Sequence, residues 1–528
     1  MTGATSVTLP RLGRDLIESG RLTSNRVVFP DRSLLDLPEK ALQFGTGAFL
    51  RGFIDYFLDE ANRKGDFGGR AVAVASTPSN RDTLLNEQQG LYTLVVEGSG
   101  ADGPREERRV VAAVSRALAA HRDWDEVLAI ARNRQLELVF SNTTEVGIQL
   151  NDSDRFDDRP PKSFPAKLTR FLIERARTFA YAHDAGVVVI PCELLEQNGD
   201  RLRDLVITLA QRWQIETAFN EWIQHAVPFC NTLVDRIVPG RPNDDKRREL
   251  EGTLGYRDDL MIAAEPYRLF AIEADAPVRA RLPFANADDG IILTDDVTPF
   301  RERKVRILNG AHTLLAPMAL AVGCRTVLEA VRSETLGRYL RRVLHDEIVP
   351  SLAAPNGEAF ALDVLTRFAN PYLRHALTDI TLQQTAKMRV RVIPSIVRCA
   401  ERTGSVPTAL AFGFAAYLFA IRASVGSDAA TRLPLARDDE GERVRQVWRT
   451  ASDEGDEKSV RESVRRVCAD ATLWQTDLTY VTGFVERVAA DVIKMTRLGV
   501  AASLAGHLDA HSAMSKPIAP SLPMPGAS

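Results

Sequence analysis

The chain has 528 residues, enough for about two to four domains at roughly 150 residues each. Hydrophobic residues make up 45% and charged residues 26%, which is typical of a globular protein with large buried cores. Lys and Arg together number 67 and Asp and Glu 70, so the formal net charge of −3 excludes a generally basic surface for nucleic acid or anionic membranes.

The five cysteines are scattered, and even Cys192 and Cys230, the nearest pair in sequence, form no CxxC, zinc-ribbon or disulfide pattern. Residues 1–16 lack the continuous apolar stretch of a signal peptide. The longest uncharged apolar run, 404–421, contains Pro407 and is shorter than the ~20 residues of a membrane span. We therefore expect a buried helix in that run and a cytoplasmic protein.

The two ends of the chain differ in character from the rest. Residues 1–38 are polar and mixed, which predicts an irregular N-terminal arm. The last residues, 513–528, are rich in proline, which predicts a disordered tail.

Residues 39–295 alternate short β-branched runs with helical segments, the pattern of a mostly parallel sheet with crossover helices. This pattern predicts a Rossmann-like α/β dinucleotide-binding domain. The expected strands are residues 41–44, 70–75, 91–96, 136–140 and 186–190.

Strand signals nearly vanish after Pro299. The runs 326–348, 407–422 and 478–498 have apolar residues at helical spacing. They predict an all-α second domain over residues 296–512, with the boundary between the domains near residues 295–299.

A glycine-rich turn follows the first expected strand and precedes a helical segment, 49–62. Gly45 permits a tight turn, Gly47 lets the backbone approach a pyrophosphate, and the helix N-terminus supplies free N–H donors. Because Leu50 replaces the third glycine of this pattern, an ordinary strand-to-helix turn remains the alternative. The residues that we expect to contact a dinucleotide here are Phe44, Gly45, Thr46, Gly47, Ala48 and Phe49.

The acid that ends the second strand in many NAD sites is missing. The chain reads Ser76-Thr-Pro-Ser-Asn-Arg81 there, and hydroxyls followed by an arginine suit the ribose phosphate of NADP, or form an ordinary loop. The sequence therefore leaves the choice between NAD and NADP open.

A lysine, an asparagine and a histidine open the helical domain in the segment Lys304-Val-Arg-Ile-Leu-Asn309-Gly-Ala-His312. In a regular α-helix the three would lie within an arc of about 140°. A lysine suits proton transfer to an alkoxide, an amide stabilises oxyanion charge, and a histidine orients a substrate oxygen. On spacing alone, a polar helix face with a capping amide is the safer interpretation.

This segment resembles the signature of the mannitol dehydrogenase family, the polyol-specific long-chain dehydrogenases. Residues 45–51 resemble the coenzyme turn of the same family, and residues 231–237 and 265–267 resemble two further motifs in the same order. The resemblance extends over roughly residues 39–505. Four shorter segments are more narrowly similar to the tagaturonate reductases, the keto-uronate branch of this family: 89–93, 140–145, 164–169 and 190–194.

The resemblance implies a reversible, NAD-dependent and metal-independent reduction of a keto-uronate, tagaturonate, to the aldonate altronate. By family role, Lys304 is the general acid/base, while Asn309 and His312 bind or polarise the reacting oxygen. Lys387 matches a position that lines the substrate site. Thr144 and Glu145 match positions near the nicotinamide.

One position departs from the polyol members, which carry an asparagine in the loop after the strand that resembles 186–190. Here Leu194 occupies that place. Either Asn309 carries the oxyanion role alone, or Asn198 substitutes from the same loop. The leucine favours the uronate branch over a plain mannitol dehydrogenase.

An anionic substrate needs a cation, ideally an arginine that binds the carboxylate with two parallel hydrogen bonds. Arg367, Arg374, Arg389 and Arg391 are candidates, and the sequence does not choose among them. We assign the substrate to Arg374, Lys387 and Asn198. We expect His375 to cap a helix, and we predict no metal site, because the pair Asp295 and Asp296 lacks a third ligand.

Two alternatives stay open. Within the same class, the protein is a fructuronate reductase or a mannitol or polyol 2-dehydrogenase. In a different class, it is a nucleotide-binding regulatory protein without turnover, against which the intact Lys304, Asn309 and His312 count. We expect a small-molecule sugar acid as the partner, no nucleic acid or membrane, and a monomer or small homo-oligomer.

Overall fold

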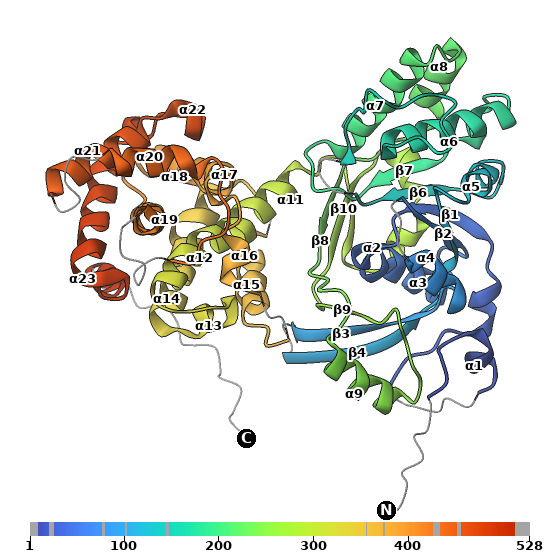
Figure 1. The fold of residues 1–528 in the computed structure, drawn as a ribbon, viewed down its shortest axis with the longest axis horizontal. Helices are drawn as coiled ribbons and strands as arrows, with labels where there is room; N and C mark the ends of the chain where they lie inside the picture. The colour runs from blue at the N-terminus through green and yellow to red at the C-terminus, as the bar shows by residue number, and fades with distance from the viewer. Residues whose placement is uncertain are drawn as a thin grey trace, which may run out of the picture. The chain divides into compact units, whose positions relative to one another are not determined.

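The computed structural model describes residues 9–20, 26–76, 80–100, 103–143, 147–354, 356–372, 375–425, 433–450 and 456–512. The chain divides into two compact units, Met1–Phe300 and Arg301–Ser528 (Figure 1). Three of the predicted site residues, Thr144, Glu145 and Arg374, lie outside the described residues, as does the predicted tail at 513–528.

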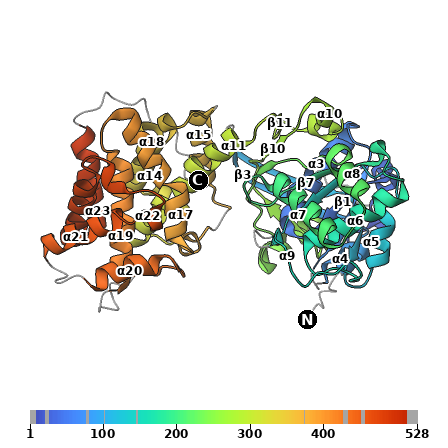
Figure 2. The ribbon, with the colours of Figure 1, turned by 90° about the horizontal axis from the view of Figure 1, so that it is seen from above.

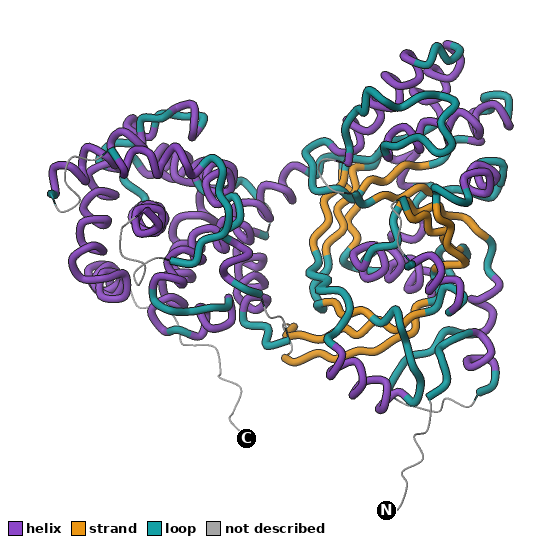
Figure 3. The backbone as a smooth tube through the Cα atoms, in the orientation of Figure 1, coloured by secondary structure: helices purple, strands orange, loops and turns teal. Residues whose placement is uncertain are grey.

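Five parallel strands form the central sheet of the first unit, in the order β5-β2-β1-β6-β7 (Figure 3). Successive side chains face opposite sides: Ala41 packs in one apolar core with Phe53 and Phe57, whereas Leu42 packs in the other with Phe171. The α/β, Rossmann-like fold class is thus confirmed. The strands are β1 (Glu39–Phe44), β2 (Arg70–Ala75), β5 (Val114–Ala119), β6 (Leu138–Ser141) and β7 (Val188–Pro191).

Helices accompany this sheet, and two further three-stranded sheets complete the unit. The helices are α1 (Arg14–Glu18), α2 (Ala48–Gly52), α3 (Ile54–Lys64), α4 (Arg81–Glu87), α5 (Trp124–Ile130), α6 (Phe164–Thr178), α7 (Asn198–Arg212), α8 (Thr217–Ala226), α9 (Asp244–Leu254) and α10 (Ala276–Arg279). One small sheet has the order β11-β10-β8, with β8 (Thr232–Asp235), β10 (Leu269–Glu273) and β11 (Ile291–Thr294).

The expected strand at 91–96 exists, but its place in the parallel sheet was wrong. It forms part of β3 (Tyr92–Gly100), which pairs antiparallel with β4 (Gly103–Val111) and parallel with β9 (Ile262–Ala264) in a separate sheet. A hairpin joins β3 to β4, so no crossover helix separates them, and a parallel pairing is impossible. The edge of the central sheet is taken instead by β5.

The N-terminal arm packs onto this separate sheet. Leu12, Val27 and Leu35 are buried in a small core with Val95 of β3. The backbone N–H of Leu12 donates to Arg257 O at 2.9 Å, and Arg11 pairs with Asp259. The described part of the arm therefore contains little regular structure, only α1 and the short 3₁₀ turn Arg32–Asp36, yet it is anchored to the unit.

The described residues of the second unit are helices and connecting turns, with no strand (Figure 2). This confirms the all-α prediction. The α-helices are α11 (Thr298–Arg303), α12 (Gly310–Ala321), α13 (Val327–Arg332), α14 (Glu334–Arg342), α15 (Gly357–Phe368), α16 (Leu377–Ile380), α17 (Gln384–Arg391), α18 (Ile393–Thr403), α19 (Thr408–Val425), α20 (Gly441–Arg449), α21 (Glu457–Cys468), α22 (Ala471–Trp474) and α23 (Phe484–Ser512, interrupted at Gly499). Two π-helical segments join them, η5 (Lys304–Asn309) and η6 (Val343–Ile348).

Helix α19 lies at the centre of the second unit, against α12, α20 and α23. By length and composition it would pass for a membrane span, with a mean hydropathy of 1.5, but 67% of its 18 residues are buried in the protein. The expected apolar run, 404–421, begins before this helix, because Gly404 ends α18 in a left-handed conformation with φ of 64°. The prediction of a buried helix holds for its remainder.

The segment 436–440 fastens the beginning of α17. The buried Asp438 carboxylate accepts hydrogen bonds from Thr385 N at 3.1 Å, Thr385 Oγ1 at 2.6 Å and Gly441 N at 3.3 Å. Thr385 Oγ1 also lies 2.7 Å from the hydroxyl of Tyr417 on α19. Beside this pair, the side chain of Gln383 donates to Asp439 at 2.7 Å. Helix α17, which carries Lys387 and Arg391, is thereby tied to the core helix.

We expect Asp438→Ala to destabilise the protein by about 2 to 4 kcal/mol, because three donors at a buried position lose their acceptor. Asp439→Ala, at an exposed neighbouring position, is the matched control and should cost less than about 1 kcal/mol. Urea unfolding followed by circular dichroism measures both. Equal losses in the two variants would contradict the assigned role of Asp438.

Candidate active site

The glycine turn connects β1 to α2 as expected. Gly45 has a φ of 141°, and its N–H donates to Val74 O of β2 at 2.9 Å. A Cβ on Gly45 would lie 2.7 Å from Leu50 Cδ1, so Leu50, the residue that replaces the third glycine, fills the space above Gly45. Gly47 is the N-cap of α2, and no heavy atom lies within 4 Å of the position that its Cβ would take. The backbone at Gly47 is therefore open to a ligand.

The expected helix at 49–62 is broken at Phe53, whose φ of −131° and ψ of −74° separate α2 from α3. Across this break Phe49 stacks on Phe53, and Phe53 meets Phe57 edge to face, each pair with ring centroids 5.0 Å apart. The short first helix is thus held by aromatic packing rather than by its own length.

Four buried polar residues lie beneath the turn. Gln43 donates to Gly45 O at 3.1 Å, and Arg51, which lies over the ring of Tyr92, donates to Leu260 O at 2.6 Å. The hydroxyl of Tyr92 contacts both Arg51 O at 2.8 Å and Asp55 Oδ2 at 3.1 Å. A phenol has a single proton, so both contacts are hydrogen bonds only when Asp55 carries a proton of its own. Burial accordingly raises the pKa of Asp55 from 3.8 to about 7.

The hydroxyl of Ser76 lies directly after β2, where the ribose-binding acid of many NAD sites would stand. Its Oγ is buried without a hydrogen-bond partner among the described residues. A buried hydroxyl without a partner, near an open glycine backbone, fits a bound ligand that supplies the missing hydrogen bond.

The loops after β6 and β7 are bonded to each other. Glu193, which is buried, accepts from Thr143 N at 2.8 Å, Thr143 Oγ1 at 3.1 Å and Ser141 Oγ at 3.1 Å. Burial raises the pKa of Glu193. These bonds fix the start of the loop in which Thr144 and Glu145 were predicted to lie near a nicotinamide.

Asn198 is fully buried at the beginning of α7. Its amide nitrogen donates to Pro191 O, Glu193 O and Thr232 Oγ1, each at 3.0 Å, and its Oδ1 accepts from Thr232 N at 2.9 Å. These bonds use the hydrogen-bonding capacity of the amide. The geometry therefore favours a structural role for Asn198 over the predicted substrate contact, while Leu194 in the same loop is exposed.

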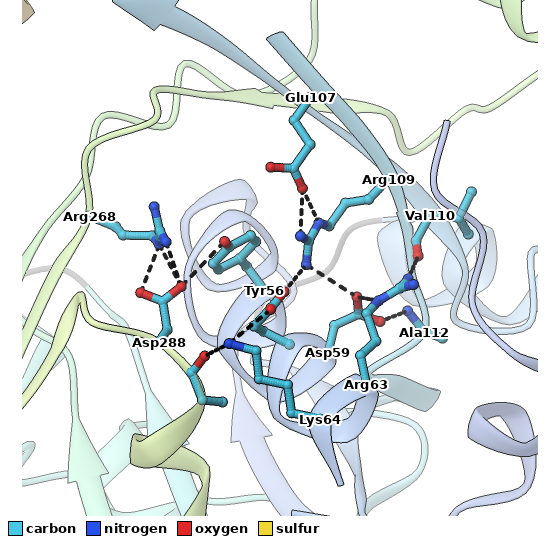
Figure 4. Close-up of polar contacts among 12 residues, drawn as sticks. Tyr56, Asp59, Arg63, Lys64, Glu107, Arg109, Val110, Ala112, Arg268 and Asp288 are labelled. Atoms are coloured by element: carbon cyan, nitrogen blue, oxygen red, sulfur yellow. Dashed lines mark hydrogen bonds and ion pairs between the residues drawn. The ribbon is translucent and has the colours of Figure 1, made fainter. Parts of the chain in front are cut away.

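Three arginines of the same unit pack around Tyr56 of α3. Arg109, Arg236 and Arg268 surround the ring of Tyr56 at 4.7, 4.6 and 5.3 Å. Figure 4 shows Arg109 and Arg268 beside Tyr56, and the ion pair of Arg268 with Asp288. Arg236 donates to Gly52 O and Glu265 O, which joins the two family-like motifs at 231–237 and 265–267 to α2. Arg236 is held in place by these two backbone carbonyls.

In the helical unit, Lys304 and Asn309 begin and end the π-helical segment η5. The expectation of a regular α-helix through His312 was wrong, because a π-turn has i→i+5 hydrogen bonds and absorbs an extra residue. Counting one residue fewer reduces the arc that contains Lys304, Asn309 and His312 from about 140° to about 60°. Lys304 is buried, and Asn309 is half-buried.

His312, on α12, is buried in an aromatic and cationic environment. Its ring stacks on Phe368 at a centroid distance of 4.0 Å and meets His375 edge-on at 5.0 Å. Its Nε2 has no hydrogen-bond partner among the described residues. Burial, followed by the charges of His375 and nearby cations, lowers the pKa of His312 well below its ordinary value. The imidazole is therefore neutral and able to bind a substrate oxygen.

Lys387 and Arg391 lie on α17, whose end meets the beginning of α12. Lys387 Nζ donates to Ile380 O at 2.8 Å, and Arg391 donates to Thr313 Oγ1, next to His312, at 3.4 Å. Burial lowers the pKa of Lys387 to about 8 and that of Arg391 to about 10. The ring of His375 faces His312, and its backbone carbonyl accepts a hydrogen bond at 3.0 Å from Val327 N, the first residue of α13.

The π-turn, the protonated Asp55 and the fastening of α17 by Asp438 were not found from the sequence. A π-turn has no compositional signal, and the partners of Asp55 and Asp438 are far away in the chain. Among the described residues, no group of three or more His, Cys, Asp or Glu side chains is arranged to hold a metal ion.

The sequence of each unit matches a known domain. Residues 39–285 match the profile of the mannitol dehydrogenase Rossmann domain, and residues 296–496 match that of the mannitol dehydrogenase C-terminal domain. The chain belongs to the mannitol dehydrogenase family. The family resemblance deduced from the motifs is confirmed, and the protein is a member of a family of dehydrogenases.

Within the mannitol dehydrogenase family, similar relatives are altronate oxidoreductases. That of Bacillus subtilis strain 168 is 39% identical over 469 residues, which cover 88% of this chain and 95% of the relative. That of Klebsiella pneumoniae strain 342 is 39% identical over 474 residues, covering 89% and 96%.

The fold is shared with mannitol 2-dehydrogenase of Pseudomonas fluorescens, whose structure is a ternary complex with NAD and D-mannitol. The TM-score is 0.69, and the match covers 94% of this chain and 99% of that one. At 22% identity, the similarity concerns the fold.

The raised pKa of Asp55 links stability to pH. The folded protein keeps the proton up to about pH 7, whereas the unfolded chain loses it near 3.8, so stability falls as pH rises between these values. Because Asn cannot ionise, the variant Asp55→Asn does not share this loss. Its free energy of unfolding, relative to that of the unsubstituted protein, should rise by roughly 2 to 3 kcal/mol from pH 5 to pH 8. Chemical unfolding at the two pH values measures this difference. Parallel pH curves would show that Asp55 is ionised in the folded protein.

Proposed function

We propose that this protein is an NAD-dependent altronate oxidoreductase that reversibly reduces tagaturonate to altronate. The proposal rests on one observation above all: the altronate oxidoreductases match this chain at 39% identity along nearly its whole length. A keto-uronate also suits the helical unit, in which Lys387 and Arg391 are partly buried cations. We place the reaction in the cytoplasm.

The coenzyme assignment is supported by the glycine turn. Gly45 and Gly47 would let the backbone approach the pyrophosphate, and Ser76 Oγ would gain a hydrogen bond from the adenosine ribose. Phe44, Thr46, Ala48 and Phe49 would complete the contact from the same segment. When bound, NADH supplies the hydride for the carbonyl carbon.

The helical unit would supply the proton and hold the reacting oxygen. Lys304 in its ammonium form would donate a proton to the alkoxide oxygen as it forms, and neutral Lys304 would remove it in the oxidation of altronate. The amide of Asn309 would donate a hydrogen bond to the same oxygen and stabilise its negative charge. His312, kept neutral by burial, would fix the orientation of that oxygen without adding a competing charge.

Two other activities are weighed against this proposal. Reduction of fructuronate would use the same residues and differ only in stereochemistry. A polyol dehydrogenase would share the fold, as the mannitol 2-dehydrogenase does, but its uncharged substrate would not supply an anionic partner for Arg391. Purified protein should be assayed with NADH and NADPH on tagaturonate, fructuronate and fructose in parallel. Tagaturonate-dependent loss of NADH absorbance is the expected result, and activity on fructose alone would overturn it.

Lys304→Ala should lower kcat for tagaturonate by about 10²- to 10⁴-fold while leaving NADH binding unchanged, because the variant removes only the proton donor. Lys458→Ala, at an exposed position of α21, is the control and should retain full activity. Stopped-flow absorbance measures turnover, and quenching of protein fluorescence measures NADH binding. If Lys304→Ala keeps its turnover, another group transfers the proton. If neither protein turns over but both bind NADH, the regulatory interpretation is favoured.

The lowered pKa of Lys387 predicts an alkaline limit. The ammonium group loses its proton near pH 8, and its attraction for a carboxylate disappears above that value. The value of kcat/KM for tagaturonate should therefore fall above about pH 8. Lys387→Arg keeps a positive charge at all these pH values and should move the fall upward. An unmoved pH profile in this variant would exclude Lys387 as the titrating group.

A further inference from the structure

Several cations of the helical unit lie around His312. Arg367, Lys387 and Arg391 are among the groups that act most strongly on the charge of His312, and no acid is among the strongest of them. The nearest carboxylates act elsewhere: Asp438 on Lys387, and Asp379 on His375. The surroundings of His312 are therefore net positive and are suited to an anion.

Arg391 is the most weakly compensated of these cations. It is the last residue of α17, and its side chain donates a long hydrogen bond of 3.4 Å to Thr313 Oγ1. No carboxylate in the described part of the chain pairs with it, and burial is the sole influence on its pKa. A guanidinium has five N–H donors, and a buried one without an acid is costly to keep. An anionic ligand would supply the missing partner.

The backbone of Arg391 is fixed next to the predicted catalytic residues. Arg306 of η5 donates to Val390 O, and a Cβ on Gly310 would lie 3.3 Å from Arg391 O. The hydroxyl of Thr313, which Arg391 contacts, donates to Asn309 O at 2.8 Å. Arg391 is thus joined through Thr313 to the turn that carries both Asn309 and His312.

The other arginine candidates have acidic neighbours. Arg389, two residues earlier on α17, forms two hydrogen bonds with Glu440 and a third with Leu473 O. Arg367 lies one helical turn from Asp363, with which it interacts electrostatically. Their charges are compensated within the protein, so neither is as free to bind a substrate.

We propose that Arg391 binds the carboxylate of the sugar-acid substrate through its guanidinium and thereby selects keto-uronates over uncharged ketoses. This inference rests on the proposed function and names the residue that sets its substrate class. Two parallel N–H···O bonds to a carboxylate match the fork of an arginine. Lys387, on the same helix, adds a second positive charge.

The test compares Arg391→Gln with Arg389→Gln, a matched change on the same helix at a compensated arginine. For each variant, kcat/KM is measured with tagaturonate and with tagatose, the ketose that has a CH₂OH in place of the carboxylate. Calorimetric binding of altronate and of altritol, its uncharged counterpart, provides a second measure that needs no turnover. Thermal unfolding verifies that each variant is folded.

Arg391→Gln should weaken altronate binding and lower kcat/KM for tagaturonate about 10- to 100-fold, with altritol and tagatose changed less than about threefold. Arg389→Gln should change charged and uncharged ligands equally. In an Arg391→Ala variant, added guanidinium ion should restore part of the altronate affinity, an effect that a purely structural role would not give.

Equal losses for charged and uncharged ligands in Arg391→Gln would overturn the inference while leaving the proposed function intact. Failure of the unsubstituted protein to reduce tagaturonate would instead overturn the proposed function. If Arg391→Gln does not fold, Arg391→Lys takes its place, and it should keep the preference for charged ligands in part. If either this variant or Arg391→Ala prefers charged over uncharged ligands as strongly as the unsubstituted protein does, Arg391 does not bind the carboxylate.

Discussion

The candidate site of the helical unit depends on one widened helical turn. Because η5 has i→i+5 hydrogen bonds, Lys304, Asn309 and His312 fall within an arc of about 60°, narrower than the arc of about 140° in a regular α-helix. Such turns are less stable than α-helix, so neighbouring contacts must hold this one. Ile307 and Leu308 are buried, and Arg306 joins the turn to the end of α17. The contact that joins the turn to Val390 lies next to Arg391, so the predicted catalytic residues and the proposed carboxylate-binding arginine share one support.

The two units use buried arginines in opposite ways. In the Rossmann-like unit, Arg175 donates to four backbone carbonyls, and Arg236 donates to two, so these guanidiniums act as structural braces. In the helical unit, Lys387 has one carbonyl partner, and Arg391 has one distant hydroxyl. Cations whose donors are already used support the fold, whereas cations with unused donors are available to a ligand.

The sequence predicted what depends on local pattern. Apolar β-branched runs located all five expected strands, and the order of motifs identified the family. Prediction from the sequence failed where contacts between distant parts of the chain decide the structure. Strand β3 belongs to a separate sheet because it pairs with β4 and β9. The amide of Asn198 is already hydrogen-bonded to Pro191, Glu193 and Thr232. Leu50 stands where the glycine motif expects a third glycine. The structure explains this difference, because the side chain of Leu50 packs over Gly45.

The anchoring of the N-terminal arm has a consequence for biosynthesis. Leu12 bonds to Arg257, and Arg11 to Asp259, so these two residues acquire their partners only after residues 257–259 have left the ribosome. At about 5 to 20 residues per second, this is a delay of tens of seconds or less, during which β1, β2 and β6 already have their pairing strands. The arm is thus attached after all the strands of the central sheet have been synthesised, so the order of translation separates the assembly of that sheet from the attachment of the arm.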